Sequence, residues 1–388
     1  MYKLRDYQIQ AVEKGADFLL NGKGNGVMVL PTGSGKSLII ANLALKLGVP
    51  ILIFQPSKEI LEQNYCKLAS YGLVDCSIYS ASAGRKQVSN VTFATIGTVY
   101  NVRNAFKGLF KYVIIDECHL APPDEGMYTE VLRLLGLRIL GLTATPYRMY
   151  SNSMGGTLRF MTRTNPRIFQ HLVYQVPIQL LVERGYLARM KYYPQVTLIG
   201  IQNLTVNSTG LDYTDKSLKD EYKRTKFADN LENLIQRLLR VGRKRILVFT
   251  KFTDEAELVA KKIGSRARFI CGETPKRERE QILADFKSER VHVVCNVGVL
   301  TTGFDYPQLD TIVMARPTRS LALWYQIVGR AMRPALHKDA WIVDPCGTYR
   351  RFGAVEDLVI KEEDFEGSRK YAVYGGQFHN VKLTNTYF

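Results

Sequence analysis

The sequence contains no closely spaced pair of cysteines and no long uninterrupted apolar segment. Its six cysteines are scattered without a C-x-x-C pair, which excludes a zinc ribbon and gives no disulfide framework. The longest apolar stretch, residues 38–54, is interrupted by polar and turn-forming residues, so it predicts helix, turn and strand rather than a membrane span. The N-terminal residues MYKLRDYQIQ lack the apolar core of a secretory signal. We therefore expect a protein of a reducing cytoplasm.

Acidic residues are also in short supply. The chain has 36 Asp and Glu against 53 Lys and Arg, which leaves a formal net charge of +17. An excess this large favours a polyanionic partner, above all nucleic acid, over a merely basic protein. The 388 residues exceed what one core usually organises, and 46% of them are hydrophobic. The composition therefore predicts a folded chain with two domains of ordinary size.

Short apolar runs alternate with helical patterns over residues 27–150, and the same alternation restarts at RILVFT (245–250). Buried runs of this kind with helices between them predict parallel sheets covered on both faces. We therefore expect an α/β protein with a first domain over 1–150. A basic linker plus the second domain should occupy 151–355, and 356–388 is expected to be a tail without a recognisable motif.

A glycine-rich turn, PTGSGKS, follows the first apolar run. Glycines lack a Cβ, so backbone N–H groups can approach an anion there, and the following helix adds its positive dipole end. We expect Lys36 to reach the β- and γ-phosphates of ATP and the Ser37 hydroxyl to bind Mg²⁺. The strict pattern has glycine where this chain has Leu30. The predicted nucleotide-binding residues of the turn are Pro31, Thr32, Gly33, Ser34, Gly35, Lys36 and Ser37.

Two carboxylates end the apolar strand in YVIIDECH (112–119). Because α/β sheets bind ligands at the carboxyl ends of their strands, we expect Asp116 to hold Mg²⁺ and Glu117 to deprotonate the attacking water. A solvated surface pair is the common alternative, but such a pair seldom closes a buried strand. His119 is either a core histidine or a contact between motifs. GLTATP (141–146) places threonine hydroxyls at the end of another strand.

Two arginines in QIVGRAMRP, Arg330 and Arg333, have a spacing that predicts one helix face. An arginine placed against the γ-phosphate accelerates phosphoryl transfer by roughly 10³–10⁵-fold. We therefore expect this pair to act in catalysis from the second domain. Without the other motifs they would indicate only a surface helix. In the preceding TTGFDYP, Gly303 permits close backbone approach, and Asp305 either binds a ribose hydroxyl or organises an arginine.

The ordered set of motifs resembles the superfamily 2 helicases. It runs from LRDYQ (4–8) to QIVGRAMRP (326–334), with FQPSKEILEQ, FATIGTV, DECH, TATP, VFT and VLTTGFDYP between them. The stretches DECHL and ILGLTATPYR look most like the bacterial RadD-type repair helicase-like proteins, with XPB-like and UvsW-like relatives next. The resemblance implies two tandem RecA-like domains with an ATP cleft between them. It also implies a bacterial or phage-infected cell as the setting, and the cysteine-rich zinc region usual in RadD-type proteins is missing here.

The same resemblance implies further contacts. Arg5 and Gln8 are expected to contact adenine, and the backbone of one nucleic-acid strand is expected to meet Ser57, Lys58, Thr95 and Gly97. The stretch after TATP is basic and has aromatic residues among its cations, so we expect it to neutralise phosphates through Arg159, Arg163 and Arg167. In the alternative interpretation these arginines pair with the acidic segment 212–232 and only hold the domains together.

These observations predict an ATP- and Mg²⁺-dependent enzyme that DNA stimulates. We expect a helicase or translocase of DNA repair, recombination or replication that binds single-stranded or branched DNA without regard to sequence. An RNA-dependent ATPase stays open, because the DECH residues do not choose the sugar. A non-unwinding ATP-gated clamp or scaffold also stays open, whereas an ordinary P-loop kinase would not need the arginine motif.

Overall fold

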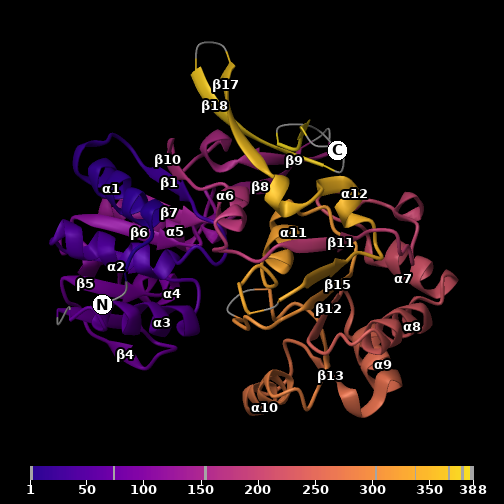
Figure 1. Ribbon diagram of the computed structural model, residues 1–388. Coiled ribbons are helices and arrows are strands. Elements are labelled where there is room, and N and C mark those ends of the chain that lie inside the picture. The colour runs from indigo at the N-terminus through magenta and orange to yellow at the C-terminus, as the bar shows by residue number, and fades with distance from the viewer. Residues whose placement is uncertain are drawn as a thin grey trace. The chain divides into compact units, whose positions relative to one another are not determined.

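The computed structural model describes residues 3–72, 75–152, 155–301, 304–336, 338–365, 368–376 and 380–384 (Figure 1). By its internal contacts the chain divides into two compact units. Unit 1 comprises Met1–Arg148, Arg159–Pro177 and Glu362–Tyr371, and unit 2 comprises Met149–Leu158, Ile178–Lys361 and Ala372–Phe388. Residues 159–177, which the sequence boundary places in the second part, therefore pack with unit 1, and 356–388 contributes to both units.

Unit 1 is built on an eight-stranded sheet in the order β10-β1-β7-β6-β2-β5-β3-β4. Every neighbouring pair runs parallel except β3 and β4. Its strands are β1 (Gly26–Val29), β2 (Ile51–Phe54), β3 (Cys76–Ser80), β4 (Arg85–Lys86), β5 (Val91–Ala94), β6 (Tyr112–Asp116), β7 (Arg138–Thr143) and β10 (His171–Gln175). Its helices are α1 (Asp6–Asn21), α2 (Lys36–Leu47), α3 (Lys58–Ala69), α4 (Ile96–Tyr100) and α5 (Met127–Leu135). The central strands β1, β2 and β6 are buried along their whole length, as parallel strands covered on both faces should be.

Unit 2 is built on a six-stranded sheet in the order β11-β16-β15-β12-β14-β13, with all neighbours parallel. Its strands are β11 (Met190–Tyr193), β12 (Ile246–Thr250), β13 (Ala267–Ile270), β14 (Val293–Asn296), β15 (Thr311–Ala315) and β16 (Ala340–Val343). Its helices are α6 (Ile178–Glu183), α7 (Asp215–Arg224), α8 (Phe227–Arg240), α9 (Thr253–Ile263), α10 (Lys276–Lys287), α11 (Leu321–Val328) and α12 (Thr348–Phe352).

Two small sheets complete the fold. β8 (Tyr147–Asn152) pairs with β9 (Gly155–Phe160), and a three-stranded sheet contains β17 (Val359–Phe365), β18 (Ser368–Gly375) and β19 (Val381–Lys382). Figure 1 shows β17 and β18 as a long hairpin. The segment without a recognisable motif therefore forms β structure. Within the described ranges, no helix is both long enough and apolar enough to span a bilayer.

The predicted α/β class with two parallel sheets is confirmed. The helix expected to carry Arg330 and Arg333 ends before them, because α11 ends at Val328 and the backbone bonds from Arg330 to Met332 reach only three residues back. Pro334 has no N–H to donate and disfavours a helical conformation at Arg333, so a continuous helix through Arg333 is disfavoured. Arg330 and Arg333 lie in the turn after the helix, so the prediction that they share a helix face is wrong.

Gly141 in β7 shows how tightly the segment 159–177 packs against the large sheet of unit 1. A Cβ at this position would lie 2.6 Å from Cys118 Sγ and 2.7 Å from the ring of Phe169. We expect Gly141→Ala to cost about 1–3 kcal/mol through overpacking and to lower Tm in scanning calorimetry. The matched control is Gly272→Ala, where no atom lies within 4 Å of the new Cβ. Equal Tm values for the two variants would contradict the tight fit at Gly141.

Candidate nucleotide site and nucleic-acid groove

The phosphate-binding turn joins the end of β1 to the start of α2. Gly33 and Gly35 have φ values of 85° and 80°, in the left-handed region, and Gly35 is the N-cap of α2. A Cβ on Gly35 would lie 2.5 Å from Gln8 Nε2, so no larger residue fits. Leu30 is fully buried, and its N–H donates to Thr143 O at 2.8 Å, so this position continues the strand and needs no glycine.

The start of α1 packs against this turn. Tyr7 Oη and Gln8 Nε2 each donate to Ser34 O at 2.8 Å, while the Arg5 N–H donates to Gln8 Oε1 at 2.9 Å. The Gln8 side chain is buried, so its amide supports the turn from behind. The expected contact of Arg5 and Gln8 with adenine stays a prediction.

The two carboxylates at the end of β6 lie beside the turn. Lys36 Nζ lies 2.7 Å from Glu117 Oε1, which joins the turn to the carboxylate pair directly. Glu117 has a φ of 48°, a conformation that costs a residue with a Cβ on the order of 1–3 kcal/mol. The backbone conformation at Glu117 points the two consecutive side chains in different directions. Asp116 is buried, whereas Glu117 is partly exposed.

Asp116 is held by a buried polar network. Asn64 Nδ2 donates to Asp116 Oδ2 at 3.1 Å and to Gln55 Oε1 at 3.0 Å, and the Glu117 N–H donates to Asp116 Oδ1 at 3.0 Å. Burial, and then the Glu117 charge, raise the pKa of Asp116 to about 7, against the opposing effect of Lys36. A bound cation would favour the ionised form. The sequence reasoning missed Asn64, although a lone polar residue on the buried face of a helix was a usable signal.

His119 links the carboxylates to the threonine motif. His119 Nδ1 lies 2.9 Å from Thr143 Oγ1, which also accepts from the Thr145 N–H at 3.0 Å. His119 Nδ1 also lies 3.4 Å from Glu117 Oε2. Burial lowers the pKa of His119, so the ring is neutral at pH 7. It is therefore both a buried histidine and a contact between motifs.

The donors beside the turn suit Mg²⁺. No group of three or more His, Cys, Asp or Glu that could hold a metal occurs in the described part of the chain. Mg²⁺ is usually bound by one or two carboxylates together with phosphate oxygens and water, so Asp116 and Ser37 are donors of the right kind. In the same described part, Ser34 Oγ is buried in the turn without a hydrogen-bond partner, which leaves a polar atom available to a ligand.

A groove of about 530 Å³ lies on unit 1. Thr95 and Gly97, both predicted to meet a nucleic-acid strand, line it, and we call it the Thr95 groove. Ser57, by contrast, caps α3, because its Oγ accepts from the Ile60 N–H at 3.4 Å. Lys58 lies 3.9 Å from Glu62 in the same helix. Contacts of Ser57 and Lys58 with a strand stay predictions.

The Thr95 groove contains a cation that the sequence reasoning missed. Lys86 of β4 lies opposite Tyr79 of β3, and Arg85 lies opposite Ser80. Residues directly opposite in an antiparallel pair share a face, and the next pair along faces the other way. Lys86 and Tyr79 both line the groove, whereas Arg85 does not. No local motif marks this residue, because the fold alone brings β4 to the groove.

In unit 2 both predicted arginines contact the loop that precedes them. Arg330 donates to Thr301 O at 2.7 Å and to Phe304 O at 2.8 Å, and Arg333 Nε lies 3.3 Å from Asp305 Oδ1. Asp305 therefore organises an arginine, and its contact with a ribose stays a prediction. Gly303 lies outside the described residues.

The arginines of the basic segment after TATP lie in different surroundings. Arg163 lies 3.9 Å from Glu363, which is outside the acidic segment 212–232. Arg167 is exposed and lines a separate groove of about 480 Å³ with Arg133. Arg159 is half-buried in β9. The role of these three arginines in nucleic-acid binding stays a prediction.

Two α/β units, with a phosphate-binding turn beside an acidic pair in the first, define a nucleotide-binding protein of the P-loop class. Residues 1–148 match the family described as "Type III restriction enzyme, res subunit", and residues 229–335 match "Helicase conserved C-terminal domain". The chain therefore carries both domain families that make up superfamily 2 helicases, and Rad25- and XPB-type proteins are among its relatives.

Three curated relatives illustrate the likeness. A "51.5 kDa protein" of a Lactococcus phage is 27% identical over 88% of this chain and 70% of its own. A protein of Haloarcula marismortui named for the Rad25-type DNA 3'-5' helicases is 28% identical, over 86% of this chain but 51% of its own. "DNA 3'-5' translocase XPB2" of Sulfurisphaera tokodaii is 24% identical over 88% of this chain and 81% of its own.

A solved structure supports the fold. A fragment of an HsdR subunit of a type I restriction enzyme from Vibrio vulnificus superposes with a TM-score of 0.67 at 20% identity. The match covers 89% of this chain and 64% of that chain. It confirms the two-domain RecA-like fold expected from the motifs.

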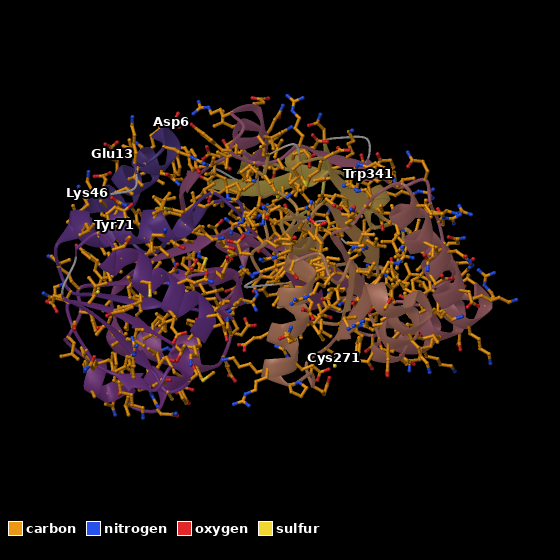
Figure 2. All side chains as sticks on the ribbon, turned by 60° about the horizontal axis from the view of Figure 1, so that its bottom comes forward. Asp6, Glu13, Lys46, Tyr71, Cys271 and Trp341 are labelled. Carbon is orange, nitrogen blue, oxygen red and sulfur yellow. The ribbon has the colours of Figure 1, made fainter. Side chains whose placement is uncertain are left out.

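The contact between Lys36 and Glu117 generates a test of the nucleotide site. We expect Lys36→Ala to weaken ATP binding strongly, because it removes the cation that meets the β- and γ-phosphates. Equilibrium binding of a fluorescent ATP analogue measures the effect. The matched control is Lys46→Ala, at the exposed far end of the same helix (Figure 2). Equal affinities of the two variants would contradict the site.

Proposed function

We propose that the protein is a nucleic-acid-stimulated ATPase that acts on DNA as a helicase or translocase. The observation that carries the proposal is the junction of Lys36, Asp116 and Glu117, which lie in one connected network beside a phosphate-binding turn. Relatives named for DNA 3'-5' helicases and translocases favour DNA as the partner. The RadD-type resemblance further suggests repair, recombination or replication as the setting.

The geometry suggests how the chain's own groups divide the work. Lys36 would bind the β- and γ-phosphates, and this contact would release Glu117 from its 2.7 Å pairing with the lysine. Glu117 would then orient the attacking water and accept its proton. Mg²⁺, held by Asp116 and Ser37, would neutralise phosphate charge. Arg330 and Arg333 are proposed to stabilise the charge that develops in the transition state.

The Thr95 groove is the proposed site for one strand of nucleic acid. Lys86 would neutralise a phosphate at its rim, while backbone and hydroxyl groups around Thr95 and Gly97 would hold the sugar-phosphate chain. Arg159, Arg163 and Arg167 are proposed to add further phosphate contacts. Such contacts carry little sequence information, so binding should be nearly independent of sequence.

The proposed chemistry is tested by ATP turnover with single-stranded, duplex and forked DNA and with RNA. We expect DNA to stimulate the wild-type protein more than RNA does. Glu117→Gln keeps the shape of the side chain but loses the base, so ATP should bind and persist unhydrolysed. Quenched-flow hydrolysis and filter binding of labelled ATP measure the two effects separately.

Glu125→Gln is the control for this variant, because Glu125 is an exposed carboxylate in the loop between β6 and α5. It should hydrolyse ATP as the wild type does. If Glu117→Gln turns over ATP normally, or if no nucleic acid stimulates the wild type, the proposal is wrong. Stimulation by RNA alone would favour the RNA-dependent alternative.

The strand groove has a control one residue away. We expect Lys86→Gln to weaken single-strand binding and to reduce the slope of log affinity against log salt by about 0.7, the value for one phosphate that is no longer neutralised. Arg85→Gln removes the same charge from the opposite face of the same short strand and should change neither quantity much. Fluorescence anisotropy over a salt series measures both. Similar effects in the two variants would show that Lys86 acts only through net charge.

A further inference from the structure

The amino ends of three neighbouring strands in unit 2 meet at one edge of the sheet. The register pairs Ile246 of β12 with Val293 of β14, and Val293 with Ala267 of β13. The Ile246 N–H donates to His292 O, and the His292 N–H donates to Arg266 O, both at 2.9 Å. The loops that precede these strands are therefore in direct backbone contact. The carboxyl ends of the same strands form the opposite edge of this parallel sheet. The loop that contacts Arg330 follows β14, so it lies at that opposite edge.

The acidic residues at this edge already have partners. Three arginines form ion pairs with them: Arg243 with Asp310, Arg245 with Glu289, and Arg290 with Asp285. Arg243 also lies 4.4 Å from the ring of Trp341, which Figure 2 labels. These arginines therefore stabilise the edge itself.

Further cations remain at the same edge. They are exposed and belong to no ion pair within the described residues, and together they form what we call the basic edge: Arg237, Arg240, Lys244, Arg266 and Arg268. Arg266 Nη2 donates to Gln236 Oε1 at 3.2 Å, which places the loop before β13 against the end of α8. The basic edge is thus formed by the last turn of α8, the two loops that lead into β12 and β13, and the start of β13.

Helix energetics explain only part of this surface. Arg237 and Arg240 lie in the last turn of α8, where cations favour the negative end of the helix dipole. Lys244, Arg266 and Arg268 lie outside the helix and gain nothing from it. Neighbouring strands lie about 4.8 Å apart, so the loops before β12 and β13 are about 10 Å apart. At physiological salt the Debye length is about 8 Å, so these charges repel one another across most of that span.

The spread of charge selects the kind of ligand. A single small anion reaches only part of a surface of this width, whereas a chain of phosphates can neutralise all of it. We propose that the basic edge is a second binding site for the phosphate backbone of nucleic acid, separate from the Thr95 groove. The proposal rests on the nucleic-acid partner of the proposed function, but it needs none of the motif residues. Contacts of this kind position a nucleic acid without reading its sequence.

The test uses the full chain with Arg240→Gln, Lys244→Gln and Arg266→Gln combined. Affinity for labelled duplex DNA, single-stranded DNA and RNA is measured over a salt series. We expect weaker binding and a smaller salt slope, by about 0.9 on duplex DNA and about 0.7 on a single strand for each phosphate that the variant no longer neutralises. The ligand that loses more phosphate contacts, after each change in slope is divided by its value per phosphate, is the form that occupies the site. ATP hydrolysis without nucleic acid should match the wild type.

The matched control combines Lys216→Gln, Lys223→Gln and Lys261→Gln. These exposed lysines of α7 and α9 also belong to no ion pair within the described residues, so the control removes the same charge from a different surface. Equally weakened binding in the two triple variants, or unchanged binding in the first, would overturn the inference and leave the proposed function intact. A wild-type chain that binds no nucleic acid would overturn both. Tm values of all variants show whether folding is preserved.

Discussion

The site depends on one constraint, the common direction of the strands in the first sheet. Because β1, β7 and β6 are parallel neighbours, the segments that follow them leave the sheet at the same edge, strand by strand about 4.8 Å apart. The phosphate-binding turn, the threonine motif and the acidic pair are far apart in sequence, yet this register places them together. The contacts from Lys36 to Glu117 and from Thr143 to His119 are its direct result.

Burial of charge then determines how the site is organised. A carboxylate removed from water needs compensation, and Asp116 receives it from Asn64, from a backbone N–H and from Lys36 nearby. Burial nevertheless raises its pKa to about 7, so these neighbours compensate the lost hydration of the carboxylate only in part. A cation bound there would complete the compensation. Glu117 is more exposed than Asp116, and its charge is compensated by Lys36. A phosphate would attract the same lysine.

Local pattern was enough to predict the elements that carry chemistry. A turn with glycines between an apolar strand and a helix predicts its own geometry, and Gly33 and Gly35 adopt it. The shared helix face of Arg330 and Arg333 was predicted wrongly because it rested on spacing alone, whereas α11 ends at Val328. Asn64 was missed although its burial on a helix face was a usable signal, and Lys86 was missed because only the fold brings β4 to the groove. Gln8 was assigned to a base by resemblance, whereas its hydrogen bonds support the turn.

The path of the chain through the two units has a consequence for dissecting the protein. Strand β10, at residues 171–175, completes one side of β1, the strand that ends in the phosphate-binding turn. A fragment that stops near residue 150 would keep every nucleotide-binding residue of the first unit. It would nevertheless leave the backbone of β1 unpaired along one side, as a new edge open to pairing with another chain. The smallest autonomous form of the first unit therefore has to extend beyond the last motif of that unit, at least through β10.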